Sequence, residues 1–233
     1  MIEQAVILAA GKGKRMKKNT TDPVLLNTPK PLLKVKGISL IENKIKPLIE
    51  KGVDVVVVIN KDDEKAFKEA LKDYPIKFVY QGNETGTAAS LYSSKELINK
   101  DMFLVLMGDD LIDYDTDNVL NLNEPTVFAA KVEDVSNYGA IVTNEENEVI
   151  DILEKKKSGE GLANTGIYVM PKEFFEIYNE IPVDEKSGEK FLTEAIWLLR
   201  KKGIKFKVKT IKRWIGINTP EELKKAEETW NPK

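Results

Sequence analysis

The sequence predicts an α/β fold: a doubly wound, mixed and mostly parallel sheet flanked by helices, with a small β-rich insertion. Three observations lead to this prediction. The first half alternates strand and helix patterns, its strands are almost wholly apolar, and the second half changes to paired strands. A strand such as "VDVVVVI" (53–59) is apolar on both sides, which is typical of a parallel sheet covered by helices. At 233 residues the chain suits one domain, 1–233, better than two.

The first half, 1–130, supplies the alternating elements. Strands are predicted at 5–8, 53–59, 77–80, 103–107 and 126–130, with helices at 39–51, 62–73 and 87–98. In a doubly wound sheet the ligand crevice lies at the carboxyl ends of the strands, near the point where the strand order reverses. Residues that directly follow these strands are therefore the candidates for a site.

The second half, 131–233, carries the β-rich insertion and then returns to helices. The stretch "YGAIVTNEENEVIDILEK" (138–155) predicts two strands joined by a polar turn, and "GLANTGIYVM" (161–170) follows. Helices are predicted at 172–178, 191–202 and 220–228, and a strand at 205–208. Thr219 and Pro220 have the pattern of an N-cap followed by the first residue of a helix.

Composition excludes several kinds of chemistry. The chain has no Cys and no His, which removes thiol nucleophiles, disulfides, imidazole catalysis and most zinc sites. Chemistry must then use carboxylates, lysines, backbone amides and hard metals. A net charge of -2 argues against a nucleic-acid partner. No apolar stretch approaches about 20 residues, and the N-terminus lacks a signal-peptide layout, so we expect no membrane association and a cytoplasmic location.

The stretch "VILAAGKGKRMKK" (6–18) leads from a strand into a basic glycine turn. Gly11 and Gly13 would allow backbone N–H groups to turn toward phosphate oxygens. Composition alone favours a solvated surface loop. The turn matches neither a Rossmann fingerprint, because Met16 replaces the third glycine and no helix is expected at once, nor a Walker A loop.

Two further positions have the chemistry of an anion site. Lys30 lies between Pro29 and Pro31, so its backbone is stiff and extended and its ammonium group is pre-positioned. Asp109 follows an apolar strand in "LVLMGDDLI" (104–112), where it faces the crevice and offers oxygen ligands to Mg²⁺. Asp110 is the other candidate for the Mg²⁺ ligand, although this residue could equally be a helix cap or a carboxylate in a turn.

Motifs along almost the whole chain resemble those of the sugar-1-phosphate nucleotidylyltransferases, an NTP transferase family. They are L-A-A-G-x-G-x-R-M (8–16), P-K-P-L-L-x-V-x-G-x-x-L-I (29–41), "GTAAS" (86–90), "LVLMGDD" (104–110), "YGAIV" (138–142), "ILEK" (152–155), "LANTGIYVM" (162–170) and "WIGINTPEEL" (214–223). Their order and spacing agree with the family. Hexapeptide repeats are missing, so we expect a short form without the C-terminal left-handed β-helix of some relatives.

The resemblance implies a Rossmann-like nucleotidyltransferase fold in which 1–130 bind the nucleotide and 131–233 bind the sugar phosphate. It implies Mg²⁺-dependent transfer of a nucleotidyl group from an NTP, with UTP or dTTP favoured, to a sugar 1-phosphate. The implied catalytic residues are Arg15, Lys30 and Asp109. The implied nucleotide-binding residues are Leu8, Ala9, Ala10, Gly11, Gly13, Lys14, Gln81, Gly86, Thr87 and Asp109. Sugar-phosphate contacts fall on Tyr138, Gly139, Glu154, Lys155 and Asn164, and Mg²⁺ ligands on Asp109 and Asn218.

The sequence also departs from the family pattern. The gap between Arg15 and Lys30 is longer than usual, and we expect "KNTTDPVLLN" (18–27) to be a flexible lid over the triphosphate. Gly216 stands where many members carry a metal-binding aspartate, so Asn218 takes that role here, unless it merely caps the next helix.

Two other functions stay open at the level of sequence. One is a CTP-dependent enzyme acting on inositol phosphate, choline phosphate or a similar phosphorylated alcohol. The other is a non-catalytic sensor of nucleotide sugars, against which the retained Arg15, Lys30 and Asp109 argue. The sequence leaves the oligomeric state open, including a homo-oligomer.

Overall fold

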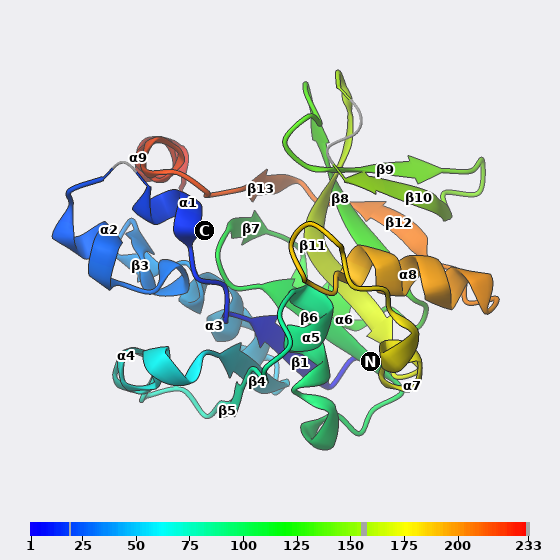
Figure 1. Ribbon diagram of the computed structural model, residues 1–233, viewed down its shortest axis with the longest axis horizontal. Coiled ribbons are helices and arrows are strands. Elements are labelled where there is room, and N and C mark those ends of the chain that lie inside the picture. Colours follow the sequence, from blue (N-terminus) through cyan, green and yellow to red (C-terminus); the bar gives the residue numbers. More distant parts are fainter. Residues whose placement is uncertain (19, 155–157, 232–233) are drawn as a thin grey trace.

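The computed structural model describes residues 1–18, 20–154 and 158–231, and it centres on one mixed sheet (Figure 1). The parallel core has the order β6-β1-β4-β5, from strands β1 (Gln4–Leu8), β4 (Asp54–Ile59), β5 (Lys77–Tyr80) and β6 (Met102–Met107). Val55 to Ile59 are fully buried, which explains why this strand is apolar on both sides. The predicted α/β fold with a mixed sheet flanked by helices is confirmed.

The second half extends this sheet with antiparallel strands. The long strand β11 (Gly161–Pro171) pairs with β6, with β8 (Thr126–Val132) and with β9 (Gly139–Thr143). Strand β10 (Val149–Glu154) forms the outer edge beside β9, whereas β12 (Lys207–Thr210) pairs with β8 in the parallel direction. A separate two-stranded ladder joins β7 (Leu111–Asp113) to β13 (Arg213–Ile215).

Helices cover both faces of the sheet (Figure 1). One face packs against α5 (Thr87–Tyr92), α7 (Phe174–Ile177) and α8 (Leu192–Lys201). The other packs against α3 (Glu42–Glu50), α4 (Glu64–Ala70) and α6 (Thr116–Leu120). Short 3-10 turns complete the set: η1 (Lys30–Leu32), η2 (Lys61–Asp63), η3 (Lys95–Leu97) and η4 (Tyr178–Glu180). No described helix has both the length and the apolar character needed to cross a bilayer.

A third, smaller core holds the N-terminal turn. Here α1 (Lys14–Lys17), α2 (Pro23–Asn27) and the hairpin of β2 (Lys34–Val35) and β3 (Ile38–Ser39) pack beside α9 (Pro220–Thr229). Met16 and Leu25 are buried in it together with Trp230. This core joins the segment 16–40, which follows β1, to the C-terminal segment 217–230.

The structure differs from the sequence predictions in this region. A short helix, α1, does begin directly after Gly13, and the segment predicted as a flexible lid contains α2. Asp22 accepts a hydrogen bond from the backbone N–H of Val24 and Pro23 occupies the first turn, so a helix start was encoded there. Because Leu25 is buried, α2 is attached to the body of the protein.

Gly86, which precedes α5, is in close contact with the backbone of the segment 184–192. It has φ of 105°, and a Cβ there would lie 2.6 Å from the backbone nitrogen of Lys190. Gly86→Ala should therefore lower the free energy of unfolding by more than about 2 kcal/mol. Thermal unfolding should record a fall of roughly 5 °C or more.

Gly82→Ala is the matched control, because nothing lies within 4 Å of a Cβ at that position. Its melting temperature should stay close to that of the parent protein. Equal effects of the two substitutions would contradict the tight contact.

Candidate functional site

Three strand ends of the parallel core meet at one place. The backbone N–H of Ala9 donates to Val58 O at 2.8 Å, and that of Gly108 donates to Leu8 O at 2.9 Å. Ala9 and Ala10 are buried, and Asn60 Nδ2 donates to Ala10 O at 2.5 Å. The loops that follow β1 and β6 therefore run side by side, as expected for the crevice of a doubly wound sheet.

The basic glycine turn lies beside Lys30. Gly13 has φ of 59°, a left-handed conformation that favours glycine, and it caps the N-terminus of α1. A Cβ at Gly13 would lie 3.3 Å from the Cβ of Lys30. Met16 is buried, whereas Arg15 and Lys14 are exposed. The buried Met16 thus attaches α1 to the protein, while the side chains of Lys14 and Arg15 remain accessible to an anion in solution.

Lys30 and Asp109 form an ion pair. Lys30 Nζ lies 2.6 Å from Asp109 Oδ2, although the two residues are 79 positions apart in the chain. The lysine side chain is only 7% exposed and the aspartate is 42% exposed. The backbone of Lys30 is not extended as predicted, because the residue begins the 3-10 turn η1. The structure nevertheless brings this lysine together with the carboxylate that the family resemblance assigned to metal binding.

Asp110 has the opposite surroundings. Its Oδ1 lies 3.1 Å from Nζ of the fully buried Lys44, and its Oδ2 accepts from Trp214 Nε1 at 2.7 Å. Burial lowers the pKa of Lys44 and raises that of Asp110, while the mutual attraction opposes both shifts. Because both carboxylate oxygens of Asp110 are engaged, Asp109 is the carboxylate of this turn that remains accessible to a ligand.

Sequence reasoning missed Lys44. It lies on the apolar side of α3, between the buried residues Ile41, Ile45 and Leu48. A lysine inside an apolar helical stripe is a readable signal, because a charge is rarely buried without a partner. Its partner could not be read from the sequence, since Asp110 is 66 positions away.

The β7–β13 ladder brings Asn218 to the same end as Asp109. Leu111 pairs with Ile215 in antiparallel register, so the chain before Leu111 and the chain after Ile215 leave the ladder together. Thr219, and not Asn218, caps α9 through a capping box with Glu222. The alternative interpretation of the Asn218 side chain as the helix cap is therefore wrong.

These oxygens suit a hard cation. In the part of the chain that the structure describes, no group of three or more acidic, His or Cys side chains is arranged for a metal. Asp109 could instead contribute one carboxylate, and Asn218 one amide oxygen, to a sparser set of oxygen donors. Such a set fits Mg²⁺, which keeps several waters and uses one or two carboxylates together with substrate phosphates.

The predicted sugar-contacting residues line up across three strands. Gly139 pairs with Glu154, and a Cβ on Gly139 would lie 2.9 Å from Glu154 Oε1. Ala140 pairs with Ala163, so Asn164 follows on the other side of Gly139. The side chain of Asn164 is fixed by Tyr168 OH at 2.8 Å and by the backbone N–H of Gly166 at 3.1 Å. Lys155 lies outside the described residues.

Tyr138 connects the predicted sugar-contacting residues to strand β13, which carries Trp214. Its ring packs edge-on against Trp214, with centroids 4.9 Å apart. Burial raises the pKa of Tyr138, Glu222 adds to the shift, and the positive charge of Arg15 opposes it. Arg15 and Tyr138 are therefore within electrostatic reach of each other.

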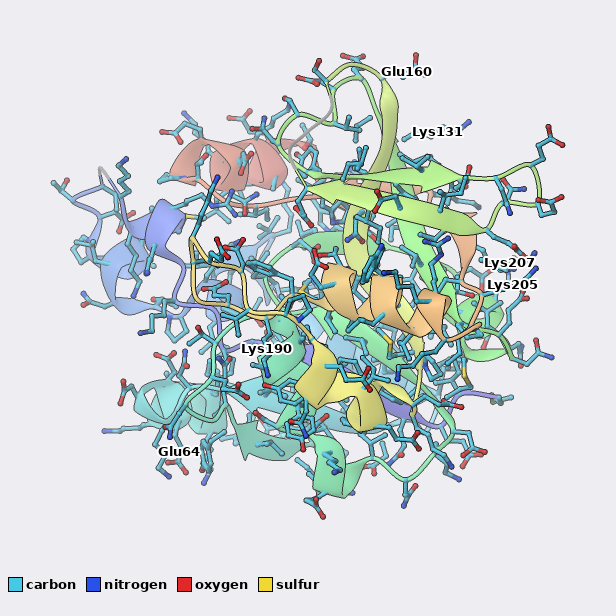
Figure 2. All side chains as sticks on the ribbon, turned by 45° about the vertical axis from the view of Figure 1, so that its right-hand side comes forward. Glu64, Lys131, Glu160, Lys190, Lys205 and Lys207 are labelled. Carbon is cyan, nitrogen blue, oxygen red and sulfur yellow. The ribbon has the colours of Figure 1, made fainter. Side chains whose placement is uncertain are left out.

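The predicted nucleotide-binding residues Gln81 and Thr87 make hydrogen bonds within the protein. Gln81 Nε2 donates to Glu84 O at 3.0 Å, and Thr87 Oγ1 accepts from the backbone N–H of Leu192 at 2.9 Å. The N–H of Ala88 donates to Lys190 O at 2.9 Å. Figure 2 labels Lys190 in the loop that precedes α8, next to α5. The Thr87 hydroxyl thus helps to fasten that loop onto the turn.

Comparisons with known proteins identify the family of this chain. A sequence profile described as "Nucleotidyl transferase" matches residues 4–231. The chain belongs to the nucleotidyl transferase family. It is 32% identical over 227 residues to the bifunctional protein GlmU of Methanocaldococcus jannaschii, covering 95% of this chain and 53% of that protein.

Two further nucleotidyl transferase comparisons are informative. A bifunctional sugar-1-phosphate nucleotidylyltransferase/acetyltransferase of Sulfurisphaera tokodaii is 30% identical, over 93% of this chain and 53% of that protein. The chain spans about half the length of these curated relatives. The solved inositol-1-phosphate CTP transferase from T. maritima, at 22% identity, shares the fold with a TM-score of 0.75 over 99% of this chain and 98% of that chain.

The buried pair gives a stability prediction. Lys44→Met leaves the Asp110 carboxylate buried without its cation, which should cost about 3–5 kcal/mol of unfolding free energy. Urea unfolding followed by circular dichroism measures the loss.

Lys51→Met is the matched control at the end of the same helix. Lys51 pairs with Asp117 at 2.6 Å, but the two side chains are 43% and 65% exposed. Its removal should cost no more than about 1 kcal/mol. A Lys44→Met variant as stable as this control would contradict the burial of the pair.

Proposed function

We propose that this nucleotidyl transferase transfers a nucleotidyl group from a nucleoside triphosphate to a sugar 1-phosphate, with Mg²⁺, giving an NDP-sugar and pyrophosphate. The observation that carries the proposal is the Lys30–Asp109 contact of 2.6 Å beside the basic glycine turn. Both reactants are anions, so an enzyme for this reaction has to neutralise charge and align them. The similarity to the bifunctional sugar-1-phosphate nucleotidylyltransferase/acetyltransferase of Sulfurisphaera tokodaii supports the substrate class.

In the proposed reaction a phosphate oxygen of the sugar 1-phosphate attacks the α-phosphorus of the triphosphate in line. The bond between the α-phosphorus and the bridging oxygen breaks, and pyrophosphate leaves with that electron pair. No covalent enzyme intermediate is needed, which suits a chain without Cys or His. Backbone amides of Gly11 and Gly13 and the side chains of Lys14 and Arg15 hold the β- and γ-phosphates.

Lys30 acts on the α-phosphate. Its side chain is almost fully buried, so its ammonium group has little freedom to turn away from Asp109 or from a phosphate placed beside it. When the triphosphate binds, the lysine exchanges its carboxylate partner for the α-phosphate. Asp109 and Asn218 would hold Mg²⁺, which when bound neutralises charge on the phosphates.

The two halves then have separate tasks. Residues 1–130 bind the nucleotide, with Gln81, Gly86 and Thr87 near the base, and residues 131–233 bind the sugar phosphate. Glu154 and Asn164 flank Gly139 in neighbouring strands, which suits two hydrogen bonds to sugar hydroxyls and a third from a backbone N–H. Tyr138 borders the same row, and Lys155 would pair with the sugar's phosphate.

A panel of triphosphates and acceptors tests the function. UTP, dTTP, CTP and ATP are each mixed with Mg²⁺ and with a sugar 1-phosphate, inositol phosphate or choline phosphate, and pyrophosphate release is measured. We expect release with UTP or dTTP and a sugar 1-phosphate. Release with CTP and inositol phosphate instead would favour the second candidate, which the likeness to the T. maritima fold supports. No release with any pair would favour a sensor.

Lys30→Ala should lower turnover by at least about 100-fold while the protein stays folded, because the charge that develops on the α-phosphate loses its nearest cation. Steady-state pyrophosphate release and far-UV circular dichroism provide the two readouts. Lys34→Ala, at an exposed lysine four positions on, is the control and should retain parental turnover. Near-parental turnover of Lys30→Ala would remove the lysine from the mechanism.

Glu154→Gln should weaken binding of the sugar 1-phosphate and leave binding of the triphosphate almost unchanged. The change keeps the shape of the side chain but replaces a charged acceptor, so the KM for the sugar 1-phosphate should rise about 10-fold or more. The KM for the triphosphate should stay within about twofold, since Glu154 lies in β10, at the far edge of the sheet from β4 and β5. A larger change in the KM for the triphosphate would argue against the assignment of subsites.

A further inference from the structure

All three oxygens of Asp110, the two of its carboxylate and its backbone carbonyl oxygen, have a partner in Lys44 or Trp214. Lys44 Nζ donates to the backbone carbonyl of Asp110 and lies 3.1 Å from its Oδ1. Trp214 Nε1 donates to Oδ2 at 2.7 Å. Lys44 itself is fully buried, and its ammonium group also donates to Leu40 O at 3.0 Å. One lysine thereby joins α3, the turn after β6 and, through Asp110, strand β13.

Both candidate metal ligands, Asp109 and Asn218, are close in sequence to the two residues that Lys44 connects, Asp110 and Trp214. Asp109 is the residue before Asp110, so fixing the carbonyl and carboxylate of Asp110 restricts the backbone of the turn that carries Asp109. On the other side, Trp214 leads through Gly216 to Asn218. A Cβ on Gly216 would lie 3.3 Å from the Trp214 ring, so the chain folds closely back over the indole.

We propose that Lys44 is a positioning residue for the metal site: through Asp110 and Trp214 it sets the spacing between Asp109 and Asn218. The inference rests on the proposed function, because it concerns the Mg²⁺ that the proposed reaction uses. The partners of Lys44 lie within the protein, so in this proposal it acts on the metal site only through Asp110 and Trp214. It acts on two chain segments that arrive from positions far apart in the sequence.

Stability alone is a poor explanation for this pair. Removing two charges from water is costly, and well-packed apolar side chains in place of a buried ion pair are often as stable or more stable. Lys44 is surrounded by Ile41, Ile45 and Leu48, which would accommodate an apolar neighbour. What an apolar side chain cannot supply is a donor that holds a carbonyl and a carboxylate of the same residue.

The test uses the variant Lys44→Met/Asp110→Asn, which removes both charges together and leaves no buried unpaired ion. The asparagine side chain that replaces Asp110 retains an oxygen for the Trp214 N–H. The protein is titrated with Mn²⁺ in the presence of UTP, dTTP or CTP, and binding is followed by water-proton relaxation enhancement, which reports metal held on the slowly tumbling protein. Turnover is measured in parallel against Mg²⁺ concentration.

We expect the double variant to bind Mn²⁺ at least about 10-fold more weakly, the effect typical of changes behind the direct ligands. Half-saturating Mg²⁺ should rise to match, while kcat at saturating Mg²⁺ changes by no more than about threefold. Lys51→Met/Asp117→Asn removes an exposed ion pair as the control and should leave both quantities unchanged. A folded double variant with parental Mn²⁺ affinity would overturn the inference.

A second variant keeps the test decisive if the double variant does not fold. Trp214→Phe keeps an aromatic ring but removes the donor to Asp110 Oδ2, and Mn²⁺ affinity should again fall severalfold. Trp197→Phe, at a partly exposed position on α8, is its control. Unchanged Mn²⁺ affinity in a folded Trp214→Phe variant would contradict the inference.

Asp109→Asn separates this inference from the proposed function. If the parent protein shows no Mn²⁺ binding with any of the nucleotides, or if Asp109→Asn binds as the parent does, the metal assignment in the proposed function is wrong. If Asp109→Asn abolishes binding and the Lys44 variant leaves it unchanged, only the positioning role is wrong.

Discussion

Two neighbouring carboxylates in the turn after β6 have opposite surroundings, and the rest of the site depends on that difference. Asp110 is buried and held by Lys44 and Trp214, whereas Asp109 is partly exposed and pairs with Lys30. If both faced solvent, a cation would have two flexible partners and no fixed geometry. Burying one of them fixes the turn, and the accessible carboxylate then has a defined position beside the basic glycine turn.

The doubly wound sheet makes this arrangement possible because it delivers its loops to one edge. The turns after β1 and β6 are hydrogen-bonded to each other through Leu8 O and the N–H of Gly108. The side chains that give chemistry come from outside the sheet, however. Lys30 comes from the turn η1, and Lys44 comes from α3. The small core around Met16 also contains Leu33, the residue that follows η1, and Leu32 of η1 is buried against the sheet. The glycine turn and η1 are therefore held in place by apolar packing.

Local patterns in the sequence predicted most of the fold, because apolar strands and amphipathic helices are determined by neighbouring residues. The strand at 77–80 and the start of α9 at Pro220 agree with the prediction to the residue. The short elements β7, β13 and α1 escaped it, since so few residues carry too little periodicity to be recognised. The site followed from motif resemblance, but the Lys44–Asp110 pair is a contact across 66 positions, which no local pattern contains.

The distance between the two proposed subsites is set by strand pairing and not by a loop. Strand β11 pairs with β6 through Tyr168 and Val105, and a bulge between Asn164 and Tyr168 then carries β11 past the end of β6. Gly166 lies within this bulge with φ of 73°, and any side chain there would collide with Met107. Met107 precedes Gly108 and Asp109, so the sugar-side residue Asn164 and the metal-side residue Asp109 extend from adjacent, hydrogen-bonded strands. Such a rigid spacing favours a reaction whose two phosphorylated reactants must meet in line, because misalignment costs rate even when both reactants bind.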